Sequence, residues 1–279
     1  MAEITVALIS KLRQRTGAGL GNCRKALIES DGDIEAAIDE LRKKGIATAA
    51  KKAGRATKEG VIAQCIGEGA KSGILIEVNC ETDFVAKNDK FQEFCNGIAA
   101  ALLENPEADL EDKRTEAVAE IGENVQITRH EQLTVDGIGC VAAYIHHGSK
   151  IGVLVEVAAG QEGTLEADSF KTLVKDITLQ IAAADPEAVT REEIDPALVA
   201  KEREIAAEQF KDKPPQAVEK IVDGKLDKFF QEKCLVEQAF VKQGDLALKD
   251  YIGNVAKELR DEITVNRFLR FQVGETADD

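Results

Sequence analysis

The chain contains 279 residues, of which 44% are hydrophobic and 31% are charged, and its formal net charge is −15. This composition is typical of a folded globular protein long enough for two or three domains, and it excludes a largely disordered chain. The acidic excess opposes contact with nucleic-acid phosphates and with anionic membrane surfaces, so we expect neither as a direct partner.

Residues 1–46 predict a compact module of three short helices, because apolar residues recur at helical spacing in three successive runs. These residues are Ile4, Leu8, Ile9 and Leu12, then Cys23, Ala26 and Leu27, then Ile34, Ala37, Ile38 and Leu41. Asp33 can cap the third helix, and Gly45 is expected to end it. Residues 47–60 are rich in Ala, Lys and Gly and are expected to form a partly helical linker with a solvated basic face.

Residues 61–138 predict the first half of an α+β core. An apolar run before and after a Gly-containing turn indicates an antiparallel hairpin, and the amphipathic helix that follows ends before Pro106. The expected elements are strands over 61–66 and 73–78, a surface loop over 82–87, helices over 89–103 and 112–121, and a strand over 125–130.

A second half, over 139–186 and 233–279, repeats the first. The segment 66–78 recurs at 145–157 with seven identities in thirteen positions, and the same offset continues without a gap through the following helix. The strands and the helix therefore exist twice, but the loop over 82–87 does not, because Phe84 corresponds to Gly163. Since the second copy has no apolar side chain there, we expect Phe84 to be held out for a partner.

Residues 187–232 have no counterpart in the first half and predict an inserted antiparallel helical hairpin. Asp195 is followed by Pro196 at the first helical position, and two consecutive prolines turn the chain between the helices. The facing stripes are expected at Leu198, Glu202, Ile205 and Gln209, and at Val218, Ile221, Val222 and Phe229. A helix over 245–259 and a strand over 264–273 then complete an α+β fold with antiparallel sheets.

Two long motifs carry a resemblance to a known family. Residues 79–87 (NCETDFVAK) resemble the signature of bacterial elongation factor Ts, the guanine-nucleotide exchange factor for elongation factor Tu. Residues 12–20 (LRQRTGAGL), followed by CRKAL at 23–27, resemble its second signature. With His147-Gly148 and residues 268–274, the resemblance covers essentially the whole chain, and it implies a ubiquitin-associated-like N-terminal module.

The resemblance also implies where the partner binds. Thr82, Asp83, Phe84 and Val85 would enter the G domain of elongation factor Tu near its Mg²⁺ site, with Phe84 as the wedge. His147 lines up with the family's His-Gly, which contacts another domain of elongation factor Tu. Less specific matches imply further contacts for Arg13, Leu20, Arg24, Val241 and Lys242. From the residues alone, Asp83 could equally be a helix cap and Phe84 equally a packing residue. For the turns before Leu20 and at His147, the residues alone favour a plain structural or surface role. Gly21 stands where the family often has a larger apolar residue, which predicts a weaker contact there.

No catalytic or metal-binding motif accompanies these signatures. The six cysteines show neither a C-x-x-C pair nor zinc-type spacing, so we expect free thiols in a reducing cytoplasm, no metal and no cofactor. We also expect no signal peptide and no membrane span.

Two alternatives to an exchange factor remain. One is an enzyme with a nucleophile made of Cys80 and either His146 or His147, and the other is an adaptor that only tethers partners. We predict an exchange factor without covalent chemistry. In the family the insertion can serve self-association, which the sequence leaves open.

Overall fold

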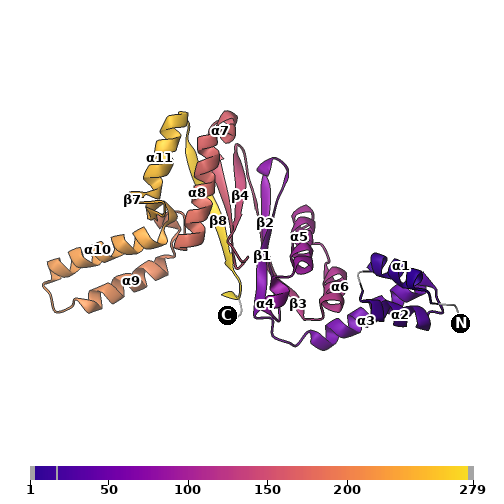
Figure 1. Ribbon diagram of the computed structural model, residues 1–279. Helices are drawn as coiled ribbons and strands as arrows, with labels where there is room; N and C mark the ends of the chain where they lie inside the picture. Colours follow the sequence, from indigo (N-terminus) through magenta and orange to yellow (C-terminus); the bar gives the residue numbers. More distant parts are fainter. Residues whose placement is uncertain (1–3, 17, 276–279) are drawn as a thin grey trace.

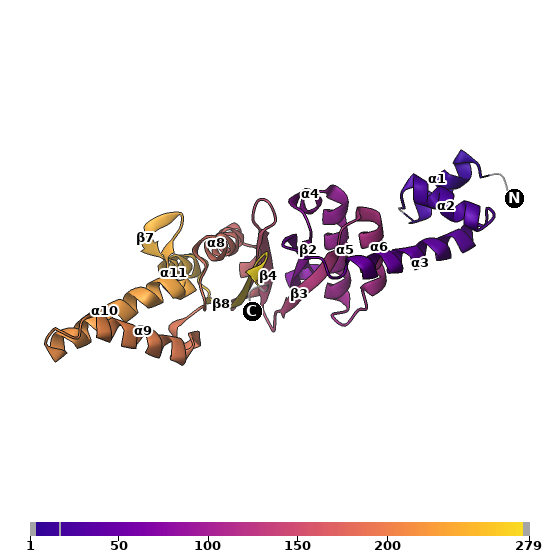
Figure 2. The same cartoon turned by 90° about the horizontal axis from the view of Figure 1, so that it is seen from below.

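The computed structural model describes residues 4–16 and 18–275, so the turn predicted around Gly17 lies partly outside the described residues. The N-terminal helices lie at one end of an elongated molecule, two sheets lie in the middle, and a pair of long helices extends at the other end (Figures 1 and 2). The mixture of helices with antiparallel sheets confirms the predicted α+β class.

The first three helices are α1 (Val6–Thr16), α2 (Leu20–Glu29) and α3 (Ile34–Lys52). They enclose a small core of Leu12, Cys23, Ala26, Leu27 and Ala37. The predicted cap is confirmed, since the Asp33 carboxylate accepts a hydrogen bond from Ala36 N at 3.0 Å.

The prediction that Gly45 ends the third helix is wrong, because α3 continues through it to Lys52 and includes the first six residues of the predicted linker. Gly45 is buried against α6 (Glu111–Ile121), where a Cβ would lie 3.5 Å from that of Ala119. Packing of α3 on α6 therefore outweighs the tendency of Gly to stop a helix.

The first sheet has the strand order β1-β2-β3, formed by β1 (Glu59–Ile66), β2 (Ser72–Cys80) and β3 (Val125–Thr134). Both pairings are antiparallel, and the short η1 (Glu68–Ala70) turns the chain between β1 and β2. Helices α5 (Asp89–Glu104) and α6 cover the outer face of this sheet (Figure 1). The sequence predicted a surface loop over 82–87. The structure instead has one helical turn there, α4 (Asp83–Ala86).

The second sheet repeats this arrangement with the order β4-β5-β8, formed by β4 (Gly139–Ile145), β5 (Ile151–Ala159) and β8 (Ile263–Gln272). Its helices are α7 (Glu162–Glu166), α8 (Asp168–Ala184) and α11 (Leu248–Leu259). The duplication extends beyond the predicted hairpin and helix, because the register shifts at the same point in both sheets. Opposite Glu77 and Val78 of β2 the extra residue is Thr128 of β3, and opposite Glu156 and Val157 of β5 it is Asn266 of β8.

The two sheets pack face to face and form a shared apolar layer. Its buried members come from both sheets and are Ile62, Leu75, Leu133, Val135, Val141, Leu154 and Phe271. The approach is close at two equivalent glycines: a Cβ on Gly152 would lie 2.4 Å from Ile62 Cγ2, and one on Gly73 would lie 2.8 Å from Val141 Cγ1. The core is therefore a four-layer stack of helices, sheet, sheet and helices (Figure 1).

The insertion contains η2 (Arg191–Glu193), α9 (Pro196–Gln209) and α10 (Pro215–Lys233), which ends one residue beyond the predicted boundary and is followed by η3 (Leu235–Glu237). The predicted stripe on α9 has the wrong register, because Ile205 is 42% exposed while Ala206 is buried against Val222 and Leu226 of α10. The small Ala206 lets the helices approach closely. A ribbon of β6 (Ala239–Phe240) and β7 (Gln243–Ala247) was not predicted and occupies the beginning of the helix expected over 245–259.

Candidate partner-binding site

Among the described residues of the α+β core, Phe84 is the most exposed large hydrophobic side chain. It is 81% exposed, whereas Ala86 on the same turn is buried and Val85 packs against the core of the first half. Exposing a Phe to water is unfavourable by ~1.5–3 kcal/mol relative to burying it. The prediction that Phe84 points away from the core is confirmed, and packing of Phe84 at the rim of the fold is excluded.

The second half shows that the turn itself needs no such side chain. The equivalent α7 is also a short helix, so the prediction that this segment exists only once is wrong for the backbone. The difference lies in the side chains: Gly163 stands at the position of Phe84, and a Cβ there would meet nothing within 4 Å. At this turn, an exposed large apolar side chain is thus present in the first half and absent from the second.

The start of α4 is held by Glu123, which sequence reasoning missed. Its carboxylate accepts hydrogen bonds from Glu81 N at 3.1 Å, Thr82 N at 3.0 Å and Thr82 Oγ1 at 2.7 Å. Thr82 in turn caps the helix by accepting from Val85 N at 3.4 Å. The contact is reciprocal, because Asn124 N donates to Glu81 Oε1 at 2.6 Å. This bond, with a further one from Arg55, lowers the pKa of Glu81.

Asp83, in the first turn of α4, is a surface carboxylate that forms an ion pair with Lys87. Lys87 Nζ lies 2.7 Å from Asp83 Oδ2, and its hydrogen bond lowers the pKa of Asp83. Thr82, not Asp83, is the cap, so the alternative role of Asp83 as a cap is excluded. Water screens an ion pair this exposed, so another cation or hydrogen-bond donor can replace Lys87 at low cost.

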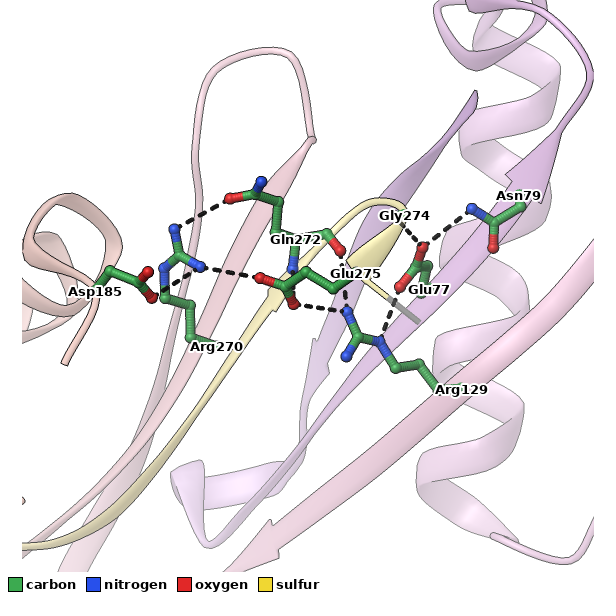
Figure 3. Close-up of polar contacts among 8 residues, drawn as sticks. All are labelled: Glu77, Asn79, Arg129, Asp185, Arg270, Gln272, Gly274 and Glu275. Carbon is green, nitrogen blue, oxygen red and sulfur yellow. Dashed lines mark hydrogen bonds and ion pairs between the residues drawn. The ribbon is translucent and has the colours of Figure 1, made fainter. Parts of the chain in front are cut away.

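Strand β2, which delivers α4, is anchored by a buried glutamate. Glu77 is fully buried and accepts hydrogen bonds from Arg129 Nε at 2.8 Å, Gly274 N at 2.8 Å and Asn79 Nδ2 at 3.0 Å. Figure 3 shows how ion pairs carry this network from Arg129 into the second half, through Glu275, Arg270 and Asp185. The segment bearing Phe84 therefore starts from a fixed strand.

The turn with His147 lies at the same end of the two-sheet core as α4. His147 is exposed between β4 and β5. Ser149 O accepts from Ile62 N at 2.7 Å, and Lys150 Nζ lies 2.5 Å from Glu59, which is opposite Cys80 in the β1–β2 pair. The fold thus brings two distant sequence candidates to one end of the core.

The other candidates lie elsewhere. Arg13, Leu20 and Arg24 are exposed on α1 and α2, and these helices stand apart from α4 in both views (Figures 1 and 2). Val241 is 48% exposed in the turn between β6 and β7, and its N–H donates to Gln180 Oε1 at 2.8 Å. Lys242 is an ion-pair partner, with Nζ 2.5 Å from the buried carboxylate of Asp176. These residues form separate exposed points rather than one continuous site.

The thiol chemistry of the site opposes a nucleophilic role. All six cysteines are free. Cys80 is buried, its Sγ donates to Thr82 O at 3.2 Å, and burial raises its pKa to about 12. The ring of His146 bonds to Tyr144 through Nδ1 at 3.0 Å. A protonated, enclosed thiol is a poor nucleophile, which argues against the alternative of a cysteine enzyme.

Within residues 4–16 and 18–275, no group of three or more His, Cys, Asp or Glu side chains is arranged to hold a metal ion. Among the helices of that same part of the chain, none combines the length and the apolar character that crossing a membrane requires.

Comparison with known proteins adds an independent finding. Residues 81–275 match the model of the family described as elongation factor TS. The elongation factor Ts of Trichlorobacter lovleyi is 42% identical over 290 residues, covering 98% of this chain and 93% of the relative. Those of Symbiobacterium thermophilum and of Clostridium botulinum strain Eklund 17B are also 42% identical, covering 99% and 98% of this chain and 93% of each relative.

Proposed function

Because this chain belongs to the elongation factor Ts family, we propose that it binds elongation factor Tu in its GDP-bound form and accelerates the release of GDP. Nucleotide exchange on elongation factor Tu is the known role of the family. The observation that carries the proposal for this chain is Phe84, which is 81% exposed on a helical turn that the fold holds firmly.

The proposed mechanism is mechanical insertion. The 82–85 segment (Thr82, Asp83, Phe84 and Val85) enters the G domain near the Mg²⁺ site, and Phe84 fills an apolar crevice there. Burying its ring contributes ~1.5–3 kcal/mol, which offsets local distortion of the partner. The Mg²⁺ ion neutralises phosphate charge in such GTPases, so displacing the residues that support it weakens GDP binding. Asp83 leaves Lys87 and stabilises the displaced arrangement by hydrogen bonding, without ligating the metal.

Thermodynamic linkage fixes the direction of the effect. A protein that speeds GDP release by shifting populations must bind the nucleotide-free GTPase more tightly than the GDP-bound form. By reciprocity, binding of GDP or GTP to the GTPase lowers the affinity of this chain for it. The chain therefore dissociates after each exchange and acts in substoichiometric amounts, with no covalent step, no cofactor and no metal of its own.

Different segments of the chain supply the remaining contacts with the partner. We propose that the 1–46 module contacts the G domain through Arg13, Leu20 and Arg24, and that the 47–60 segment links it to the core. The first half, 61–138, supplies Phe84. The second half, 139–186 with 233–279, contacts another domain of the partner through His147, Val241 and Lys242. The 187–232 insertion is available for self-association, and the site of action is the cytoplasm, where translation occurs.

The experiment is a time course of fluorescent GDP release from elongation factor Tu with this chain at one-tenth of the GTPase concentration. An exchange factor releases all of the GDP, with about ten turnovers per molecule, and copurifies with the nucleotide-free GTPase. A tethering adaptor would leave the release rate unchanged, and this result would refute the proposal. The Cys80→Ser variant should remain active, whereas loss of activity in that folded variant would favour a cysteine enzyme.

A further inference from the structure

We propose that Glu123 is a positioning residue for nucleotide exchange: its carboxylate holds the first residues of α4 and thereby fixes the direction in which Phe84 points. The inference rests on the proposed function, because it concerns how the same turn is presented to the GTPase. Glu123 lies 42 residues after Glu81 in the sequence and does not itself need to touch the partner.

The need for such a residue follows from the length of α4. The helix has four residues, and a helix this short is not stable by itself, because nucleation fixes several residues for a single hydrogen bond. Its geometry must therefore be imposed from outside. The three hydrogen bonds to Glu123 all come from Glu81 and Thr82, directly before the helix. The buried Ala86 then secures the other end of the turn.

The geometry of the three bonds explains how direction is transmitted. One carboxylate oxygen accepts the N–H groups of Glu81 and Thr82, at 3.1 and 3.0 Å, and the other accepts the Thr82 hydroxyl at 2.7 Å. The same hydroxyl oxygen accepts Val85 N, so Glu123 fixes the backbone and the cap together. Phe84 lies between these two fixed points.

The second half contains an equivalent acidic residue that holds the start of its short helix, but no exposed aromatic ring. Asp261 precedes β8 as Glu123 precedes β3, and it accepts hydrogen bonds from Gln161 N at 3.0 Å and Thr164 Oγ1 at 2.5 Å, at the start of α7. Because Gly163 replaces Phe84 there, removing Asp261 perturbs an equivalent turn that carries no wedge. Asp261→Ala is therefore a control for the general cost of losing such a contact.

The test is a double-mutant cycle of Glu123→Ala with Phe84→Ala, measured as acceleration of GDP release from elongation factor Tu. A misplaced group far from the reacting atoms can cost up to about a hundredfold in rate, and we expect Glu123→Ala to lose about tenfold or more. In the Phe84→Ala background the same change should have less than about a twofold further effect, since coupled residues are not additive. Asp261→Ala should change the rate by less than about twofold.

Glu123→Gln supplies a conservative rescue. Its amide oxygen can accept the two backbone N–H groups and its NH₂ group can donate to Thr82 Oγ1, so it should keep most of the acceleration. Thermal unfolding of every variant shows whether it is folded.

Three outcomes would overturn the proposal. An undiminished effect of Glu123→Ala in the Phe84→Ala background would show that Glu123 acts through the whole fold. Full activity of Glu123→Ala, with Phe84→Ala impaired, would refute the positioning role and leave the proposed function standing. Full activity of both variants would refute the wedge and the positioning role together.

Discussion

Replacing Arg129 by Met should destabilise the protein by ~3 kcal/mol, because it leaves the buried carboxylate of Glu77 without its charged partner. Removing one member of a buried ion pair costs ~3–5 kcal/mol. The lower figure applies here, because Glu77 keeps its hydrogen bonds from Asn79 and Gly274 (Figure 3). The variant also loses the guanidinium that lies 4.1 Å from the ring centroid of Phe271, although the Met side chain retains part of that packing.

The duplicated fold provides a control for this variant. Arg267 Nε donates to Glu156 at 2.7 Å as Arg129 does to Glu77, but the Arg267 side chain is 55% exposed and that of Arg129 only 22%. Because water reaches the Arg267 guanidinium and Asn266 Nδ2 still donates to Glu156, Arg267→Met should cost only ~1–2 kcal/mol. Urea unfolding monitored by circular dichroism measures the stability loss of each variant, as a shift of the unfolding midpoint at constant slope. A loss below ~1 kcal/mol for Arg129→Met, or equal losses for both variants, would refute the reasoning.

Two further predictions concern packing and pH. Gly152→Ala places a Cβ 2.4 Å from Ile62 Cγ2 between the sheets. Calorimetry should therefore show a lower melting temperature, equivalent to a destabilisation of ~1–3 kcal/mol. Gly163→Ala, at a position with open space, is the control, and equal melting temperatures for the two variants would contradict the prediction. Hydrogen bonds from Arg191 lower the pKa of Glu237, so its stabilisation is present above the unfolded pKa and lost as pH falls through the folded value. Urea titrations between pH ~5 and ~3 should therefore show a smaller loss of stability for Glu237→Gln than for wild type, and identical losses would contradict this.

The parts of the fold that the sequence predicts are those with local patterns. Alternating and continuous apolar runs bounded by glycines located both hairpins, and the repeat of 66–78 at 145–157 revealed the duplication without any structure. The exposure of Phe84 was predictable for the same reason, since the equivalent Gly163 shows that the turn does not need a buried ring there.

Features that depend on distant partners were not predictable. Gly45 was expected to stop a helix, but the surface of α6 that keeps it helical lies far along the chain. On α9 the buried Ala206 carries no strong apolar signal, so the exposed Ile205 was assigned to the stripe instead. Glu123 gave no signal at all, because a single acidic residue before a strand becomes meaningful only when the backbone of Thr82 is seen beside it.

The most direct test of the central claim is a stopped-flow chase of fluorescent GDP from elongation factor Tu with wild-type chain and with Phe84→Ala. Ile205→Ala, which removes an exposed apolar side chain from α9, serves as the control. The account predicts that Phe84→Ala folds normally but loses roughly 10- to 100-fold of the acceleration, the equivalent of ~1.5–3 kcal/mol of ring burial. Wild-type acceleration by the Phe84→Ala variant would contradict it.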